Sequence, residues 1–548
     1  MKTIPSILRI LTLLIGLTTS SALSDILFLR CMEADNYRII SQKVTLFSKY
    51  ADLEEEGKAF MDALDRAIRI PGKVGFSENE GLRIFTVADT SKKLTPDNPG
   101  TVVFIPLRAS RDSVLKAFRK AYRQEKPLPR ISGHLYTGAV STHTPPSAAI
   151  AFTGLHAITA PSEEILQWAW KNREQLIHAP NQNIEGDIRL LLIAPRCADL
   201  LEYSAPALAA VPHLQENMRA FSTLLLSFSL NIQNLEIKIE GRPLPGSKGE
   251  KAIRSWQFLH TRRWAELPEP STRLFSLLSA RLGTLSLETF STPPYTRLLE
   301  PVRFPDPKQC GDSPLLCLYP TEDDKGLMLV RTLPLKPGAY PSEMCSLPEG
   351  KPVDGLVFTR LKGRSLKNGT EVARYRVSLP KRESSKREIA PTILSLLLHH
   401  AVLEASVTDK ALVTVWGPDR ADLIEQALRA LRSPAPRISL DRKIRVEIPR
   451  MERELFTAGG SIYPIRLLKK LASITPSIPE RFLDALPRSG DGIRWAMTKG
   501  AETDSILLAI SVTTDEISNF QRVIREMRPA LQEIFLSLIG PKIEKKEN

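Results

Sequence analysis

The pair of residues that most suggests catalysis is Ser113 and Lys116, which stand in a Ser-x-x-Lys spacing. Residues three apart share one face of a helix, so the lysine amine could activate the serine hydroxyl as a nucleophile. The pair follows a predicted strand over 102–107, and either Ser110 or Asp112 is suited to cap a helix at this point. We therefore interpret Ser113 as a residue of a first helical turn and Lys116 as a side chain that points to solvent.

The histidines form no recognisable metal motif, because none of the eight has a second histidine four positions later. His399 and His400 are adjacent, so on a helix their rings would diverge by about 100° and could not share an ion. His400 lies four residues before Glu404, which is a weak two-ligand spacing, but a strand is expected to begin there. The sequence predicts neither a metal site nor a cofactor.

Dispersed acids near glycine-rich turns are the remaining chemical candidates. Glu452 and Glu454 precede the turn at 458–461, and Asp484 and Asp491 lie near a second turn at 488–492. A hydrolase could use such carboxylates, although solvated surface acids are the alternative interpretation. The glycine-basic turn at 245–250 lacks the spacing of a phosphate-binding loop. We assign no catalytic, cofactor-binding or metal-binding residue.

The elements around these residues recur along the chain at an offset of about 255 positions. Residues 148–161 parallel residues 404–418, and each segment is predicted to form a β-hairpin that ends at a proline suited to open a helix. The helices expected next span 163–175 and 421–431.

Further matched segments support the repeat, and all are predicted to be strands. They pair 100–107 with 354–361, 187–196 with 443–450, 224–230 with 493–498 and 235–240 with 506–512. The strict alternation of apolar and polar residues in 235–240 indicates a sheet with one solvated face.

These patterns predict an α+β protein of two homologous halves, residues 25–291 and 352–541, each a mainly antiparallel sheet with helices packed on one face. Its order of elements resembles exported bacterial proteins that carry a domain of unknown function. The resemblance covers most of the chain, and it implies a pattern of elements without catalytic residues.

A proline-rich connector is expected between the halves, over residues 292–351, because twelve of the 42 prolines fall between positions 293 and 352. A single strand is predicted within it, over 326–333. The last residues, 542–548, form a charged tail that we expect to be disordered.

The N-terminus has the three regions of a secretory signal peptide. Lys2 and Arg9 precede the apolar run 10–17, and small residues follow up to Ala22–Ser24, so cleavage is expected near there, with residues 1–24 removed. An uncleaved membrane anchor is the alternative, although the apolar run is short for a span. We predict an exported protein of the periplasm or extracellular envelope.

Five cysteines in 548 residues are too few for a disulfide-built scaffold, so the core must be hydrophobic. Cys310, Cys317 and Cys345 lie close together in the sequence and could close one loop, leaving one thiol unpaired. Three unpaired thiols are the alternative.

The net charge falls from +14 to +12 on removal of the signal peptide, because Lys2 and Arg9 leave and no acid does. A basic exported protein meets anionic envelope components such as phospholipid headgroups and acidic glycans, so weak, salt-sensitive attraction to these is expected. No dense basic block suggests nucleic acid, and the alternative is that the charge serves solubility alone.

The composition, 42% apolar and 25% charged, is that of a folded globular chain with room for two to four domains. We expect a non-catalytic binding or structural protein of the cell envelope. The alternative is an envelope hydrolase whose dispersed carboxylates meet at the interface of the two halves.

Overall fold

The structure is a computed structural model. It describes residues 30–86, 100–141, 144–154, 156–177, 185–195, 197–198, 214–254, 259–260, 274–279, 315–322, 326–336, 352–353, 356–367, 369–378, 401–408, 411–432, 455–474, 486–487, 492–499, 505–523 and 525. The predictions for 1–24, 443–450 and 542–548 lie outside these residues.

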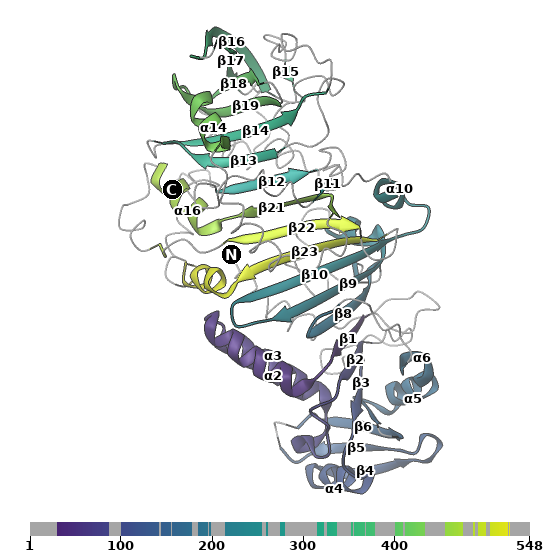
Figure 1. The fold of residues 1–548 in the computed structure, drawn as a ribbon. Helices are drawn as coiled ribbons and strands as arrows, with labels where there is room; N and C mark the ends of the chain where they lie inside the picture. The colour runs from purple at the N-terminus through teal and green to yellow at the C-terminus, as the bar shows by residue number, and fades with distance from the viewer. Residues whose placement is uncertain are drawn as a thin grey trace, which may run out of the picture. The chain divides into compact units, whose positions relative to one another are not determined.

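The chain divides into two compact units, which are Met1–Ile253 with Gly500–Leu507, and Arg254–Lys499 with Leu508–Asn548. Each unit has an antiparallel sheet and a hydrophobic core of its own (Figure 1). The α+β class and the antiparallel pairing that the sequence predicts are therefore confirmed. Among the described residues, no helix combines the length and the apolar character needed to cross a membrane.

The sheet of unit 1 is built from neighbours that all run antiparallel. From one edge the order is β4-β5-β6-β7-β3-β2-β1-β8-β9-β10. The strands are β1 (Arg30–Ala34), β2 (Leu82–Thr86), β3 (Thr101–Pro106), β4 (Tyr122–Leu128), β5 (Gly133–Ala139), β6 (Ser147–Thr153), β7 (His156–Ala160), β8 (Ile188–Ile193), β9 (Phe221–Leu230) and β10 (Asn234–Pro243).

The helices of unit 1 cover both faces of this sheet, and Figure 1 shows α2 and α3 on one side of β1–β3 with α5 and α6 on the other. They are α2 (Tyr37–Tyr50), α3 (Glu54–Ile68), α4 (Arg111–Ala121), α5 (Glu163–Lys171), α6 (Arg173–Ile177), α9 (Leu214–Arg219) and α10 (Lys248–Arg254), with short 3-10 turns at Pro71–Lys73 and Pro129–Ile131.

The prediction that helices pack on one face is therefore wrong for unit 1. Thr159 Oγ1 donates to the carbonyl of Ile68 at the end of α3. Its neighbour Ile158 points to the opposite face, where it shares a core with Ile165 and Leu166 of α5. The physical reason lies in the strands: all six residues of β3 are buried, and a sheet that is apolar on both faces must be covered on both.

Local signals explain where several helices begin. Asn36, Ser110 and Ser162 each accept a hydrogen bond from the backbone N–H three residues ahead, at the starts of α2, α4 and α5. The predicted hairpin over 148–161 is present as β6 and β7, and its turn residue Gly154 has a φ of 55°, which glycine adopts readily.

The sheet of unit 2 follows the order β15-β16-β17-β18-β19-β14-β13-β12-β21-β22, again with antiparallel neighbours. Its strands are β12 (Phe275–Ser279), β13 (Leu315–Pro320), β14 (Leu327–Pro334), β15 (Pro352–Val353), β16 (Leu356–Ser365), β17 (Glu371–Ser378), β18 (Ala401–Val407), β19 (Ala411–Pro418), β21 (Ala458–Ile462) and β22 (Ile493–Lys499). Strands β11 (Leu259–His260) and β20 (Leu455–Phe456) pair with each other, and β23 (Ile506–Thr513) crosses the division between the units.

Helices α14 (Leu423–Arg432) and α16 (Pro464–Ile474) accompany these strands, and residues 514–523 are also helical. The predicted hairpin over 404–418 is present as β18 and β19, and α14 follows it close to the predicted position. Leu423, Ile424 and Ala427 of α14 are fully buried against the strands.

Residues 292–351 were expected to be a connector with a single strand. They contain two strands of the unit 2 sheet, so that prediction is wrong on this point. Strand β14 has the predicted position, but β13 was not predicted, and the two pair with β12 and β19 inside the unit 2 sheet. Prolines stand at the ends of both strands, at Pro320 and Pro334, where no interior ladder hydrogen bond is lost. The division between units falls at Ile253, ahead of this stretch.

Candidate functional site

A row of charged side chains crosses the middle of the unit 1 sheet. Glu33 on β1 stands directly opposite Arg83 on β2 and Arg189 on β8. Side chains two apart on a strand share a face. The residues two positions away on the three strands belong to the core beneath α5: Cys31, Phe85 and Leu191. The charged row therefore lies on the same face of the sheet as the apolar core beneath α5, next to that core.

The central carboxylate of this row is buried and doubly paired. Glu33 is 8% exposed, and its Oε1 lies 2.8 Å from Arg83 Nε while its Oε2 lies 3.3 Å from Arg189 Nη2. Arg189 also pairs with the exposed Asp35. A buried charge requires such partners, since an isolated one costs several kcal/mol.

Pairing within the row is nevertheless incomplete. Glu33 Oε2 and Arg189 Nε are buried atoms without a hydrogen-bond partner. Buried polar atoms are nearly always satisfied by the protein, by water or by a ligand. The row thus has acceptor and donor capacity that the side chains around it do not use.

A cavity of about 570 Å³ opens over this row, which is a size typical of small-molecule sites. It is lined by Glu33, Ala34, Asp35, Glu80, Gly81, Leu82, Arg83, Phe104, His156 and Arg189. All belong to unit 1, to β1, β2, β3, β7 and β8 or to residues next to them. Acids and bases therefore meet in one cavity beside the aromatic ring of Phe104, and a small polar ligand could find partners of either charge.

Cys31 lies two residues from Glu33 on the same strand, but its thiol has little tendency to ionise and act as a nucleophile. Burial, and then the charge of Glu33, raise the pKa of the Cys31 thiol far above its ordinary value. The thiolate is the reactive form of cysteine, so Cys31 behaves as a small apolar core residue.

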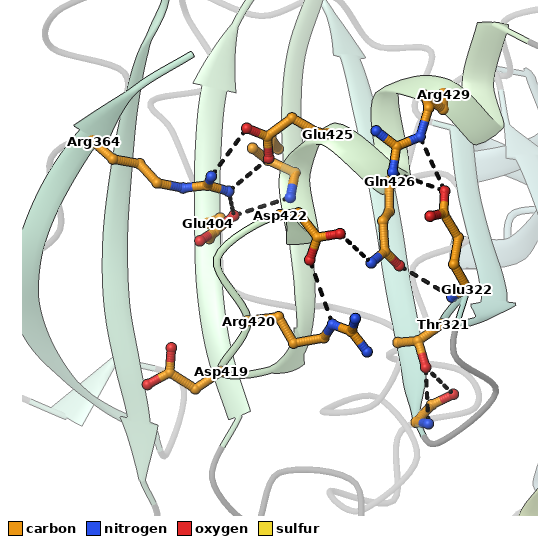
Figure 2. Close-up of polar contacts among 12 residues, drawn as sticks. Thr321, Glu322, Arg364, Glu404, Asp419, Arg420, Asp422, Glu425, Gln426 and Arg429 are labelled. Atoms are coloured by element: carbon orange, nitrogen blue, oxygen red, sulfur yellow. Dashed lines mark hydrogen bonds and ion pairs between the residues drawn. The ribbon is translucent and has the colours of Figure 1, made fainter. Parts of the chain in front are cut away.

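A second polar cluster lies in unit 2 around Glu404, which is fully buried on β18 (Figure 2). Its Oε1 accepts from Arg374 Nε at 2.8 Å, and its Oε2 accepts from Arg364 Nη2 at 2.9 Å and from the backbone N–H of Ile424 at 3.0 Å. Arg364 also donates two hydrogen bonds to the Glu425 carboxylate, from Nη1 at 3.0 Å and from Nη2 at 2.8 Å. Both oxygens of Glu404 accept hydrogen bonds. Because one of these bonds comes from the backbone of Ile424, the cluster connects the first turn of α14 to the sheet.

The same helix makes a second line of contacts, also drawn in Figure 2. Gln426 Nε2 donates to Asp422 at 2.8 Å, and its oxygen accepts from the backbone N–H of Glu322 at 3.2 Å. Arg429 pairs with the Glu322 carboxylate at 2.8 Å. The hydrogen bond from Gln426 is the main cause that lowers the pKa of Asp422.

A third cluster joins α4 to the edge of the unit 1 sheet at Glu125. Arg119 Nε lies 2.8 Å from Glu125 Oε2, while the buried Tyr136 hydroxyl donates to Oε1 at 3.0 Å and His134 Nδ1 lies 2.7 Å from the same oxygen. The Arg119 hydrogen bond is the largest cause that lowers the pKa of Glu125. We interpret this cluster as a structural contact, because its charged and hydroxyl groups pair with one another.

The residues that the sequence singled out do not gather in one place. Ser110 caps α4, Ser113 lies in its first turn with its hydroxyl 3.0 Å from that of Ser110, and Lys116 is exposed, as predicted. Glu404 is held by Arg364 and Arg374. His399, His400, Glu452, Glu454, Asp484, Asp491, Cys310 and Cys345 lie outside the described residues, and Cys317 is buried in β13.

The cavity residues were missed by sequence reasoning, although a signal existed. Glu33, Arg83 and Arg189 each stand between apolar residues within a strand, in Arg-Cys-Met-Glu-Ala, Leu-Arg-Ile-Phe-Thr and Ile-Arg-Leu-Leu-Leu-Ile. Charges at buried strand positions require partners, and three of them in neighbouring strands indicate a buried ion-pair row.

Within the described part of the chain, no group of three or more His, Cys, Asp or Glu residues is placed to hold a metal ion. The chain matches no protein-family model, and the comparisons with curated proteins and with solved structures found no match.

Proposed function

We propose that this chain is a non-catalytic binding protein of the cell envelope that holds a small polar ligand in the unit 1 cavity. The observation that carries the proposal is the cavity itself, about 570 Å³ in volume, set over the incompletely paired row of Arg83, Glu33 and Arg189. A rigid sheet floor with convergent polar groups is the usual design of a ligand site.

The envelope location rests on the N-terminal sequence, which has the regions of a signal peptide. We expect the mature chain to begin near Asp25. Fractionation of the source cells, with mass spectrometry of the intact exported chain, tests this: a chain that keeps residues 1–24 would support the anchored alternative.

We also propose that the two units arose by duplication. Their sheets support this, because β1 to β9 follow the same chain order and neighbour order as β12, β13, β14, β16, β17, β18, β19, β21 and β22. In this correspondence β3 matches β14, and β4 matches β16. The sequence comparison had instead matched 100–107, which contains β3, with 354–361, which overlaps β16. An experimental structure in which the two sheets have different strand orders would refute the duplication.

Ligand binding is tested by native mass spectrometry of the exported chain, purified without denaturation. We expect a bound small molecule in the wild type and at least a tenfold loss of affinity for that molecule in His156→Ala and Asp35→Asn. Both side chains line the cavity and are exposed enough for the fold to tolerate the change. Asp112→Asn, on the exposed face of α4, is the matched control.

Equal occupancy in wild type and cavity variants, or no bound molecule at all, would contradict the proposal. Conversion of the bound molecule into a hydrolysed product would favour the hydrolase alternative instead.

A further inference from the structure

Helix α2 presents an apolar stripe to solvent. Ile39, Leu46 and Tyr50 are 46%, 44% and 54% exposed. They are spaced seven and four residues apart, so they lie along one side of the helix. We call these three residues the α2 stripe.

The stripe is held outward by the opposite side of the same helix. Tyr37, Ile40, Val44 and Phe47 are at most 4% exposed, and they pack α2 against unit 1. The helix cannot turn its stripe inward without exposing these four side chains, because both sets lie on one rigid cylinder.

The charge of α2 is entirely positive. Its fourteen residues include Arg38, Lys43 and Lys49 but no aspartate or glutamate. Lys43 pairs with Asp187 at 2.7 Å, whereas Arg38 and Lys49 are exposed and lie together along one side of the stripe. An apolar stripe bordered by basic residues is the pattern of a helix that lies in the interface of an anionic membrane.

The charge of α2 favours an anionic partner over a second copy of the chain. A second copy of α2 is a poor occupant, since pairing two stripes would bring Arg38 and Lys49 of both copies together without an acid on either helix.

We propose that the α2 stripe docks the protein on the surface of an anionic lipid bilayer. Ile39, Leu46 and Tyr50 enter the headgroup region, and Arg38 and Lys49 contact lipid phosphates. This surface is separate from the cavity, so the proposal does not depend on the proposed ligand.

The test is co-sedimentation of the exported full chain with vesicles of phosphatidylglycerol and phosphatidylcholine, compared with vesicles of phosphatidylcholine alone. The triple variant Ile39→Ser, Leu46→Ser, Tyr50→Ser should bind the anionic vesicles at least about tenfold more weakly, because three half-exposed apolar side chains no longer enter the interface. Its matched control is Val140→Ser with Ile232→Ser, at positions that are 58% and 47% exposed.

A second pair of variants separates local from overall charge. Arg38→Gln with Lys49→Gln should weaken binding by about fivefold for each charge removed. Lys58→Gln with Lys116→Gln has the same net charge, changes exposed lysines outside α2, and should bind almost as the wild type does.

Three results would overturn the proposal. The first is equal loss in the stripe variant and its control, and the second is equal loss in the two charge pairs. The third is a concentration-dependent dimer in sedimentation velocity that the stripe variant abolishes while vesicle binding is unchanged, which would assign the stripe to a second copy of the chain.

Discussion

Glu404 and Glu33 are both buried carboxylates on sheet strands, and each is paired with two arginines. Glu33 pairs with Arg83 and Arg189 of the two flanking strands. Glu404 pairs with Arg374 of the neighbouring strand β17 and with Arg364 of β16, one strand further away. The two carboxylates differ in their pairing, since Glu404 accepts three hydrogen bonds and Glu33 keeps one buried oxygen without any. Both clusters contain a buried arginine Nε without a hydrogen-bond partner, in Arg364 and in Arg189. This difference between the carboxylates is consistent with a stabilising role for Glu404 and with the proposal that the row of Glu33 contacts a ligand.

At this scale we predict that Glu404→Gln destabilises unit 2 by about 3 kcal/mol, because it leaves two arginines short of a counter-charge and weakens the anchor of α14. Denaturant unfolding at neutral pH measures the change. Glu371→Gln, on the exposed side of β17, should cost less than about 0.5 kcal/mol and serves as the control. A loss for Glu404→Gln as small as that of the control would show that the cluster is not a stabilising anchor.

The first turn of α14 is held by hydrogen bonds to two acidic side chains. Glu404 accepts from the backbone N–H of Ile424, and Asp422 accepts from Gln426 four residues ahead. Negative charge at a helix N-terminus also interacts favourably with the helix dipole. The start of α14 is therefore sensitive to protonation of Asp422.

The pKa of Asp422 is lowered in the folded chain, so its contribution to stability is fully present above its ordinary pKa and is lost as the pH falls from that value through the lowered pKa of the folded chain. We predict that Asp422→Asn lowers stability near neutral pH and that the difference from wild type shrinks as the pH falls below about 4. Thermal unfolding at a series of pH values provides the measurement. A difference that grows on acidification would contradict the lowered pKa.

At the scale of the whole molecule, the chain consists of two compact units, each with its own sheet and core. Units of this kind are expected to fold and to open as separate cooperative blocks. The cavity and the α2 stripe both belong to unit 1, and the Glu404 cluster belongs to unit 2.

We predict that Glu404→Gln speeds hydrogen exchange in β17, β18 and α14 and leaves β1, β2 and β8 unchanged. Exchange followed by mass spectrometry of peptides from the full chain gives both readings in one sample. Parallel acceleration in the two units would show that they unfold as one block, and the assignment of separate cores would fail.

Much of the local structure could be predicted because it depends on residues close in the chain. The hairpins β6–β7 and β18–β19, the capped start of α4 and the positions of α5 and α14 all follow from turn residues, caps and apolar spacing. The N-terminal export signal is of the same kind, and it remains a prediction.

Tertiary structure alone decided the rest. The row of Glu33, Arg83 and Arg189 joins β1 to β2 and β8, and Arg189 meets Asp35 across 154 positions of sequence. Strand β13 lies between prolines that obscured its apolar pattern, and the core of unit 2 explains why it is a strand at all. Local patterns specify whether a segment extends or coils, but the partner of each strand depends on which apolar faces bury one another, and one chain's pattern leaves that choice open.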